Sequence, residues 1–588
     1  SLLYTPATLV SGRELPMHLG LPTRSVHGLP IIEHAEFGRN VPDEAMPDED
    51  KMNLGKIYHM GKEEAAGLLL NRQAMASHTF ITGSTGTGKS NAVYHLLDEI
   101  TKNGQTTFLV VEPAKGEYKN VFGNCTDVQV FGTNPRETPL LRMNPFAFPE
   151  NIHILEHIDR LVEIFNACWP MYAAMPAVLK DAIERSYQKV GWDLRNSESE
   201  KGVFPTFFDL LDILPGVIEE SHYSKDTQSD YVGALCTRVK SLTNGIYGSV
   251  LCAEDALTDE ALFDRNVIVD LSRVGSMETK SLLMGILVMK LQEYRMCSSG
   301  MNSRLRHVTV LEEAHNLLRK TSAEQSQEGA NLQGKSVEML ANAIAEMRTY
   351  GEGFIIADQA PGLLDMSVIR NTNTKIILRL PDEEDRKLVG KSAALKEAQI
   401  DELSKLPLGV AAVYQNEWPE AVLCKIEAYP MPENAVYHKP SKMPHEINAE
   451  FVFGQLAVGK ELEPLSSSEM EQLKLWLKRH ETVLKPEDSR YLERVFAGGE
   501  LDVAKTRKAV FDFFGGIGTV VDYCAAAKKS LTPRKEFLEQ LQGQYGLKAA
   551  AADWVLNSVI SMGMSLNPDA KAVDNLRTNF EQQGGRVL

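Results

Sequence analysis

Residues 83–90 have the types and the spacing of a phosphate-binding loop. They read Gly-Ser-Thr-Gly-Thr-Gly-Lys-Ser, which fits the pattern G-x-x-x-x-G-K-[ST] at every fixed position. Glycines allow backbone N–H groups to close around a phosphate at a helix N-terminus. The lysine of such a loop reaches the β- and γ-phosphates, and the hydroxyl that follows can bind Mg²⁺. We therefore predict that ATP or GTP binds here, through Gly83, Ser84, Thr85, Gly86, Thr87, Gly88, Lys89 and Ser90.

The segments on either side of the loop are the ones that it needs. Residues 78–82 are mostly apolar or β-branched and predict a short buried strand, while residues 91–100 predict a helix with an apolar stripe. A glycine-rich turn alone would be weak support for a nucleotide site. A strand, a complete loop and a helix in this order are much more specific.

Two acidic residues follow a second predicted strand. Residues 308–311 are β-branched and apolar, as in the central strand of a parallel sheet, and Glu312 and Glu313 come directly after them. Nucleotide hydrolysis needs a carboxylate that orients Mg²⁺ and a group that positions the attacking water. Glu312 is the candidate for Mg²⁺, through water, and Glu313 is the candidate for activating water. The alternative is a pair of acids that the dipole of a helix N-terminus favours.

Gln359 stands near the end of a third predicted strand, residues 353–357. A glutamine beside a γ-phosphate can sense or orient it, but an ordinary polar loop residue would look the same in the sequence. Further apolar runs lie at 108–112, 267–271 and 375–380. Strands that alternate with helices predict an α/β fold with a mostly parallel sheet, whose ligands lie at the carboxyl ends of the strands.

These segments together resemble the HerA/FtsK superfamily of ring-forming, DNA-pumping P-loop ATPases, and the HerA-like branch most closely. The resemblance covers about residues 50–430 and rests on HTFITGSTGTGKS (78–90), VVEPAKGEY (110–118), LRMNPF (141–146), VIVDLS (267–272), VTVLEEAHNLL (308–318), IAEMRTYGEGFIIADQAPGLLD (344–365) and NTNTKIILRL (371–380). It implies a RecA-like core in which Lys89 and Ser90 bind the nucleotide and Gln359 senses the γ-phosphate. It also makes Glu312 and Glu313 the Mg²⁺ and water pair. Many relatives have aspartate at the first of these two positions, which puts only the detailed Mg²⁺ geometry in question.

Arg348 has a role that only the resemblance suggests. It matches a position where the family carries an arginine that acts on the ATP of a neighbouring subunit. By spacing alone, Arg348 is a cation near the end of a helix that stops at Gly351, where the helix dipole favours it. Arg370 and Arg379 are weaker candidates for the same role.

The composition is that of a globular protein with an acidic balance. The 588 residues are 43% hydrophobic and 24% charged, with a formal net charge of −17. A free-standing duplex binder should carry a basic face, so this charge argues against broad DNA binding but leaves room for a locally basic pore. No apolar run approaches 18 residues and no signal-peptide pattern is visible, so we expect no membrane span and a cytoplasmic protein. The seven cysteines form no C-x-x-C pair, which favours reduced thiols and argues against a zinc site.

We expect four regions along the chain. Residues 1–60 form an N-terminal β-rich segment, which by resemblance is a reduced or truncated β-barrel. Residues 61–430 form the ATPase core, with a helical insertion at about 150–262. A proline-containing linker, 431–465, leads to a helical C-terminal region, 466–588. Within the core, the polar segment 319–336 predicts a flexible loop, and His153 and His157 are expected to be ordinary helix residues although their spacing places them on one face.

The resemblance implies an ATP-hydrolysing, hexameric DNA translocase or helicase that uses ATP and Mg²⁺ and passes duplex DNA through its ring. Relatives commonly work with a separate nuclease or other effector subunit, in DNA end processing or in anti-phage defence. Two alternatives remain open: a transport motor similar to type IV secretion ATPases, and an ATP-regulated scaffold for an effector. No convincing nuclease metal cluster is present in the sequence, so an effector would be a separate chain.

Overall fold

The computed structural model describes most of the chain and divides it into two compact units. The described residues are 34–42, 46–172, 174–199, 203–221, 223–253, 256–321, 329–431, 435–439, 485–496, 499–529, 532–545, 549–567 and 569–587, with a few isolated positions. The first unit consists of Ser1–Gly104 and Ile355–Pro430, and the second of Gln105–Phe354 and Met431–Leu588. The boundary after Phe354 falls inside strand β10 (Glu352–Asp358), so this strand contributes to both units.

The first unit contains a mixed sheet with strand order β2-β1-β13-β12-β11-β3-β10. Strand β3 is parallel to both of its neighbours, β10 and β11, and the strands beyond β11 pair in antiparallel fashion. All residues of β3 are buried, as expected for a strand inside a parallel sheet. The bounds are β1 (Lys51–His59), β2 (Lys62–Asn71), β3 (Thr79–Thr82), β11 (Thr374–Ile377), β12 (Val410–Gln415) and β13 (Val422–Ile426).

The second unit contains strands in the order β10-β9-β4-β8-β5. Neighbouring strands from β9 to β5 are parallel. Every residue of β8 and β9 is buried, which accounts for their continuous apolar sequence. The bounds are β4 (Thr107–Glu112), β5 (Val128–Gly132), β8 (Asn266–Asp270) and β9 (His307–Glu312). The fold is α/β with a large, mostly parallel mixed sheet, which confirms the predicted fold class.

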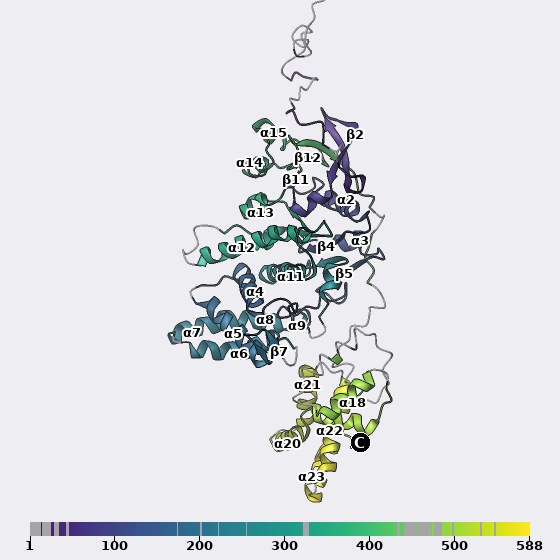
Figure 1. The fold of residues 1–588 in the computed structure, drawn as a ribbon. Coiled ribbons are helices and arrows are strands. Elements are labelled where there is room, and N and C mark those ends of the chain that lie inside the picture. The colour runs from purple at the N-terminus through teal and green to yellow at the C-terminus, as the bar shows by residue number, and fades with distance from the viewer. Residues whose placement is uncertain are drawn as a thin grey trace, which may run out of the picture. The chain divides into compact units, whose positions relative to one another are not determined.

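Helices follow most of the parallel strands (Figure 1). Helix α2 (Lys89–Thr101) follows β3, α3 (Tyr118–Phe122) follows β4, α11 (Met277–Ser298) follows β8, and α12 (Gly329–Glu346) lies between β9 and β10 in the chain. The first unit also contains α13 (Met366–Arg370), α14 (Glu383–Ser392) and α15 (Glu397–Glu402).

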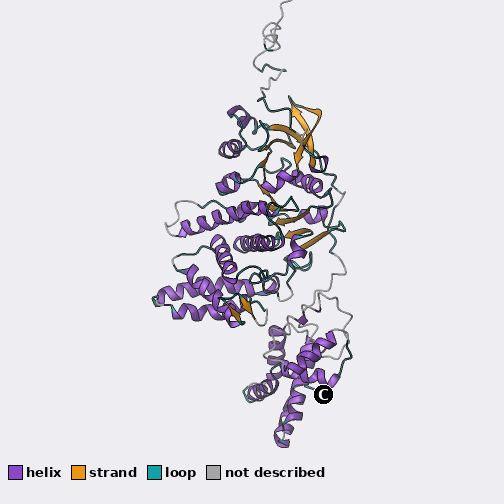
Figure 2. Ribbon diagram, in the orientation of Figure 1, coloured by secondary structure: helices purple, strands orange, loops and turns teal. Residues whose placement is uncertain are grey.

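The segment between β5 and β8 is mostly helical, with one small hairpin (Figure 2). It contains α4 (Ile154–Cys168), α5 (Met175–Lys189), α6 (Phe207–Glu220), α7 (Lys225–Tyr231), α8 (Thr237–Thr243), α9 (Gly245–Leu251), α10 (Asp259–Phe263), β6 (Trp192–Asp193) and β7 (Glu198–Ser199). Helix α4 is joined to α11 by a buried pair, in which His157 Nδ1 lies 3.0 Å from Glu293 Oε2. His153 caps α4, because its Nδ1 accepts a hydrogen bond of 3.2 Å from the N–H of Leu155. Both histidines therefore have structural roles.

Two predictions of local structure are wrong. Residues 329–336 were expected in a loop but form the start of α12; residues 322–328 lie outside the described residues. The strand expected at 375–380 ends at Ile377, because the chain then turns and Leu380 N–H bonds to Leu403 O at 3.1 Å. Most of residues 1–33 and 440–484, which include parts of the predicted N-terminal segment and linker, lie outside the described residues.

The C-terminal helices have a hydrophobic core of their own, which includes Tyr491, Tyr523, Val555 and Phe580. The helices are α18 (Pro486–Phe496), α19 (Val503–Phe513), α20 (Gly516–Ala527), α21 (Pro533–Tyr545), α22 (Ala549–Leu566) and α23 (Ala570–Gln582). Among the described residues, no single helix is long and apolar enough to cross a membrane. Helices α19 and α20, which meet at a 64° bend, pass that test as a pair on length and composition alone.

Candidate nucleotide-binding site

The predicted phosphate-binding loop leaves the end of β3 and runs into the start of α2. Gly86 and Gly88 have φ angles of 76° and 104°, in the left-handed region that favours glycine. Helix α2 then begins at Lys89, so the free N–H groups of its first turn lie at the end of the loop. Such a helix start attracts anions, because its N–H groups and the helix dipole both favour negative charge.

The loop is tightly held by its neighbours in the first unit. A Cβ atom on Gly83 would lie 2.7 Å from both Leu378 Cβ and Thr87 Oγ1, so only glycine fits there. The Thr87 hydroxyl donates to Ser84 O at 2.7 Å, and the Ser84 N–H and hydroxyl both donate to Arg379 O at 3.1 Å. These contacts fix the loop in a shape that suits a phosphate group.

Lys89, Ser90 and Gln359 lie where a bound nucleotide could meet them. Lys89 is 8% exposed at the first position of α2, and Ser90 beside it is half-buried. Gln359 follows β10, and its Oε1 accepts a hydrogen bond of 2.7 Å from the hydroxyl of Thr85. The predicted γ-phosphate sensor therefore contacts the phosphate-binding loop directly. Sequence spacing named both residues of this contact but not the contact itself.

In the second unit, Glu312 ends β9 and is 6% exposed. Its Oε1 accepts a hydrogen bond of 2.5 Å from the hydroxyl of Tyr118, at the start of α3. Sequence reasoning missed Tyr118 as a site residue, although it closes the segment VVEPAKGEY. The Tyr118 hydroxyl orients the carboxylate that we predicted as the Mg²⁺ ligand.

Acidic groups end three neighbouring strands of this sheet: Glu112 on β4, Asp270 on β8 and Glu312 on β9. Burial raises the pKa of Glu112 to about 7, and the nearby charges of Asp270 and Glu312 add to the rise. Two hydrogen bonds act in the opposite direction, because Glu112 accepts the N–H groups of Glu117 at 2.8 Å and Tyr118 at 3.1 Å. The result is an electronegative edge, as a site for a cation requires.

Lys119 neutralises part of this edge. Its Nζ lies 2.6 Å from Asp270 Oδ2 and 3.0 Å from Glu137 Oε2. Asp270 is therefore paired with a cation, and Glu312 accepts a hydrogen bond from the hydroxyl of Tyr118.

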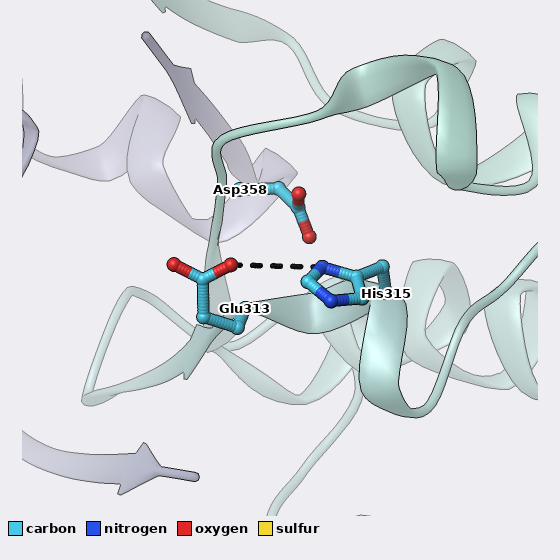
Figure 3. Close-up of side chains that lie close together, drawn as sticks. All are labelled: Glu313, His315 and Asp358. Carbon is cyan, nitrogen blue, oxygen red and sulfur yellow. Dashed lines mark ion pairs between the residues drawn. The ribbon is translucent and has the colours of Figure 1, made fainter. Parts of the chain in front are cut away.

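Glu313 directly follows β9 and adopts φ 45° and ψ 51°, a left-handed conformation that is uncommon for glutamate. Its Oε2 lies 3.6 Å from Nδ1 of His315. Asp358, the last residue of β10, lies beside this pair (Figure 3), and one ligand atom from each of the three residues lies within 4.8 Å of the others. One imidazole and two carboxylates can hold a divalent cation or position a water molecule. Sequence reasoning missed His315, whose place two residues after Glu313 was its one signal.

The three arginine candidates are exposed. Arg348 lies in the short turn η5 (Met347–Tyr350), which continues α12, and it forms no ion pair with any described residue. Arg370 ends α13, and Arg379 contacts the phosphate-binding loop only through its backbone oxygen. The side chain of Arg348 is thus available to a second molecule.

Comparison with known proteins shows which family and fold the chain resembles. Residues 52–290 match the family model for the central domain of helicase HerA. Over these residues the chain is therefore similar to the HerA family. A probable helicase of Methanocaldococcus jannaschii is 23% identical over 436 residues, which are 68% of this chain and 76% of the relative. The DNA double-strand break repair helicase HerA of Sulfolobus acidocaldarius is 25% identical over 393 residues, which are 64% of this chain and 69% of the relative.

Among solved structures, VirB4 of Thermoanaerobacter pseudethanolicus has a similar fold. Its TM-score is 0.50 at 18% sequence identity, and the match covers 66% of this chain and 98% of VirB4. At this identity the similarity concerns the fold alone. The predicted resemblance to the HerA-like branch is confirmed by the family match and the curated relatives.

Proposed function

We propose that the chain is an ATP-hydrolysing DNA translocase of the HerA type. The observation that carries the proposal is the loop between β3 and α2, where two glycines take left-handed φ angles and a third leaves no room for a side chain. A loop of this shape at a helix N-terminus fits phosphate groups. Relatives named as DNA double-strand break repair helicases support DNA as the second substrate.

Each site residue has a proposed role in hydrolysis. Lys89 binds the β- and γ-phosphates, and Gln359, held by Thr85, contacts the γ-phosphate. Mg²⁺, held by the Ser90 hydroxyl and through water by Glu312, would offset the phosphate charge. Glu313 orients the attacking water and accepts its proton as the bond to the γ-phosphorus forms and ADP leaves.

The proposed assembly is a homo-hexameric ring with duplex DNA in its pore. Arg348 would then reach the ATP of a neighbouring subunit, which its exposure permits. The net charge of −17 argues against broad DNA binding, so the proposal places the DNA contacts in the pore or on a partner. We further propose that a separate nuclease or other effector subunit supplies the chemistry on DNA, in end processing or anti-phage defence in the cytoplasm.

The test is ATP hydrolysis by the purified full chain with and without duplex DNA. We expect DNA to stimulate hydrolysis, and we expect Lys89→Ala to abolish binding of a fluorescent ATP analogue, because the phosphates lose the loop's positioned cation. Lys102→Ala, at the other end of α2, is the matched control and should bind normally. Hydrolysis that ignores DNA would favour a transport motor or a scaffold, and normal nucleotide binding by Lys89→Ala would remove the phosphate-loop interpretation.

A further inference from the structure

Four helices of the second unit, α4, α5, α11 and α12, surround an open groove of about 810 Å³. Apolar side chains from α4 and α12, such as Val162, Met339 and Leu340, form much of its wall. Met339 is 54% exposed, although most large apolar side chains of this unit are buried. A groove of this size between helices is able to accept an apolar side chain from another molecule.

Three carboxylates, those of Asp159, Glu163 and Glu346, line the groove. Glu163 accepts a hydrogen bond of 2.5 Å from the Ser336 hydroxyl, and neither Glu163 nor Glu346 has a cationic partner among the described residues. Asn166 is 4% exposed, and its buried Oδ1 has no hydrogen-bond partner in the described part of the chain.

The two cations of the groove, by contrast, are already paired. Lys180 Nζ lies 2.6 Å from Asp159 Oδ1, and Arg160 Nη1 lies 3.3 Å from Glu293 Oε1. The groove therefore suits an occupant that combines an apolar side chain with a positive charge.

The first unit presents such a group in the turn before β12. Leu408 is 62% exposed in this turn, between Lys405 and the strand. Lys405 is exposed and has no carboxylate partner among the residues that the structure describes. The turn is rigid, because Val410 N–H bonds to Pro407 O at 3.1 Å and Gly409 N–H bonds to Thr87 O at 3.0 Å. The second of these bonds ties the turn to the phosphate-binding loop.

We propose that the Leu408 turn of one copy of the chain docks into the groove of the next copy in the ring. This proposal rests on the proposed function, in which Arg348 acts on the phosphate-binding loop of a neighbour. The Leu408 turn lies beside the phosphate-binding loop, so it belongs to the surface of the chain that would bind ATP at that interface. The groove belongs to the arginine side, because α12 continues directly into the turn that carries Arg348. At 1.5 Å per residue, Met339 and Arg348 are separated by about 14 Å along the helix axis.

The docking would be a heterologous contact, in which each copy uses a different surface toward each neighbour, as ring closure requires. Leu408 would fill the apolar part of the groove, and Lys405 would face the carboxylates of Glu163 and Glu346. The Leu408 turn is bonded to the phosphate-binding loop of one copy, and the groove lies on the helix that leads to Arg348 of the next copy. The contact would therefore set the position of Arg348 relative to the bound ATP.

Cross-linking between two variants tests this contact. Leu408→Cys and Met339→Cys chains are purified separately, mixed with ATP and treated with a short bismaleimide. We expect a covalent dimer on a denaturing gel from the mixture. Each variant alone should give no more dimer than the wild-type chain, whose seven cysteines set the background. A mixture that gives no dimer, although light scattering shows rings and the rings hydrolyse ATP, would overturn the docking proposal and leave the proposed function standing.

A charge exchange gives an independent readout. Lys405→Glu should weaken ring assembly about tenfold, since a like charge then faces the groove, and adding Glu346→Lys should restore it. Lys391→Glu, on the exposed face of α14, is the matched control and should assemble normally. Assembly that is unchanged by Lys405→Glu, or not restored by the second change, would contradict the contact. A wild-type chain with neither rings nor ATP hydrolysis would instead contradict the proposed function.

Discussion

Glu313 is held in a backbone conformation that costs a non-glycine residue on the order of 1–3 kcal/mol. The surrounding residues maintain it, since Asn316 Nδ2 donates to Glu313 O at 2.7 Å and the Asn316 N–H donates to the same oxygen at 2.9 Å. Strain of this kind is concentrated at functional sites, where it fixes the direction of a side chain. The conformation turns the Glu313 carboxylate toward His315 (Figure 3).

The first prediction concerns the role of Glu313 as the base. Glu313→Gln should keep ATP bound but lower turnover by at least ~10²-fold, because the amide keeps the shape and loses the acceptor for the proton of water. Steady-state ATP hydrolysis and binding of a fluorescent analogue measure the two effects. Glu219→Gln, on the exposed face of α6, is the control for loss of a carboxylate. Unchanged turnover would move the role to Glu312 or Glu117.

The second prediction concerns the pH dependence of stability at Glu112. Its folded pKa of about 7 lies above the ordinary value of 4.5, so the folded chain holds a proton that the unfolded chain has released between these values. The contribution of Glu112 to stability is therefore full below pH 4.5, falls as the pH rises and is lost above about pH 7. At 1.36 kcal/mol per pH unit, the change is at most about 3 kcal/mol.

Glu112→Gln removes this titration, so the Tm of the wild-type chain minus that of the variant should decrease between pH 5 and pH 8. Thermal unfolding without nucleotide measures it. Glu117→Gln, at an exposed position five residues after Glu112, is the control. The Tm of the wild-type chain minus that of this variant should not change with pH. If Tm changes with pH in the same way for the wild-type chain and for Glu112→Gln, the buried carboxyl of Glu112 is ionised over the whole range from pH 5 to pH 8.

Some site residues could be found from spacing and others could not. Lys89, Ser90 and Gly86 stand in one short motif whose backbone geometry is local, so the sequence is sufficient to place them. Tyr118 and Glu312 are 194 positions apart, and they meet because β4, which precedes Tyr118 in the chain, pairs with β9, which ends at Glu312. No periodicity or motif along the chain contains that information.

At the scale of elements, the strand–loop–helix unit around Gly83 acts as one rigid part. The β3 strand is parallel to β10 and β11, and Leu378 directly after β11 packs against Gly83. Leu378 N–H also bonds to Thr82 O at 2.8 Å, so Leu378 cannot move away without breaking this link. The position of the phosphate-binding loop therefore depends on a neighbouring strand.

The third prediction follows from this packing. Gly83→Ala would place a methyl group 2.7 Å from Leu378 Cβ, and overpacking of this kind costs about 1–3 kcal/mol. We expect a lower Tm and nucleotide binding at least about tenfold weaker, measured by thermal unfolding and fluorescence titration. Gly275→Ala has open space around it and should change neither. If Gly83→Ala binds nucleotide like the wild-type chain, the loop is more adaptable than its contacts imply.

Elements with a clear pattern were predictable, and those set by tertiary contacts were not. The β-branched runs of β4, β8 and β9 predicted buried strands, which the structure confirms. Residues 329–336 end the polar segment 319–336, whose glycine, serine and glutamine residues predicted a loop. They are helical because α12 packs on α4, where Gln333 Nε2 donates to Ala167 O at 3.0 Å and Ser336 donates to Glu163. Such contacts override weak local preferences.

At the scale of the whole molecule, one chain offers a phosphate-binding loop and an exposed arginine that pairs with no described residue. An arginine that stabilises phosphoryl transfer from outside the subunit contributes about 10³–10⁵ in rate in well-studied enzymes. It has no such use in a monomer. The proposed ring would give each loop an arginine from its neighbour, and light scattering of the purified chain should then show an assembly larger than a monomer.

The last prediction is that Arg348 acts in trans. Arg348→Ala should keep nucleotide binding and ring assembly but cut turnover, whereas Arg136→Ala, another exposed arginine, should not. Lys89→Ala should also be inactive. When the two inactive variants are mixed, some interfaces join the intact loop of an Arg348→Ala subunit to the intact arginine of a Lys89→Ala subunit, so part of the ATPase activity should return. A ring that needs every site to turn over would show no recovery, and single-turnover measurement in the mixed rings separates that case. If Arg348→Ala alone hydrolyses ATP normally, Arg348 has no catalytic role and is only a cation near the end of a helix. Arg379 and Arg370 would then be the next residues to test.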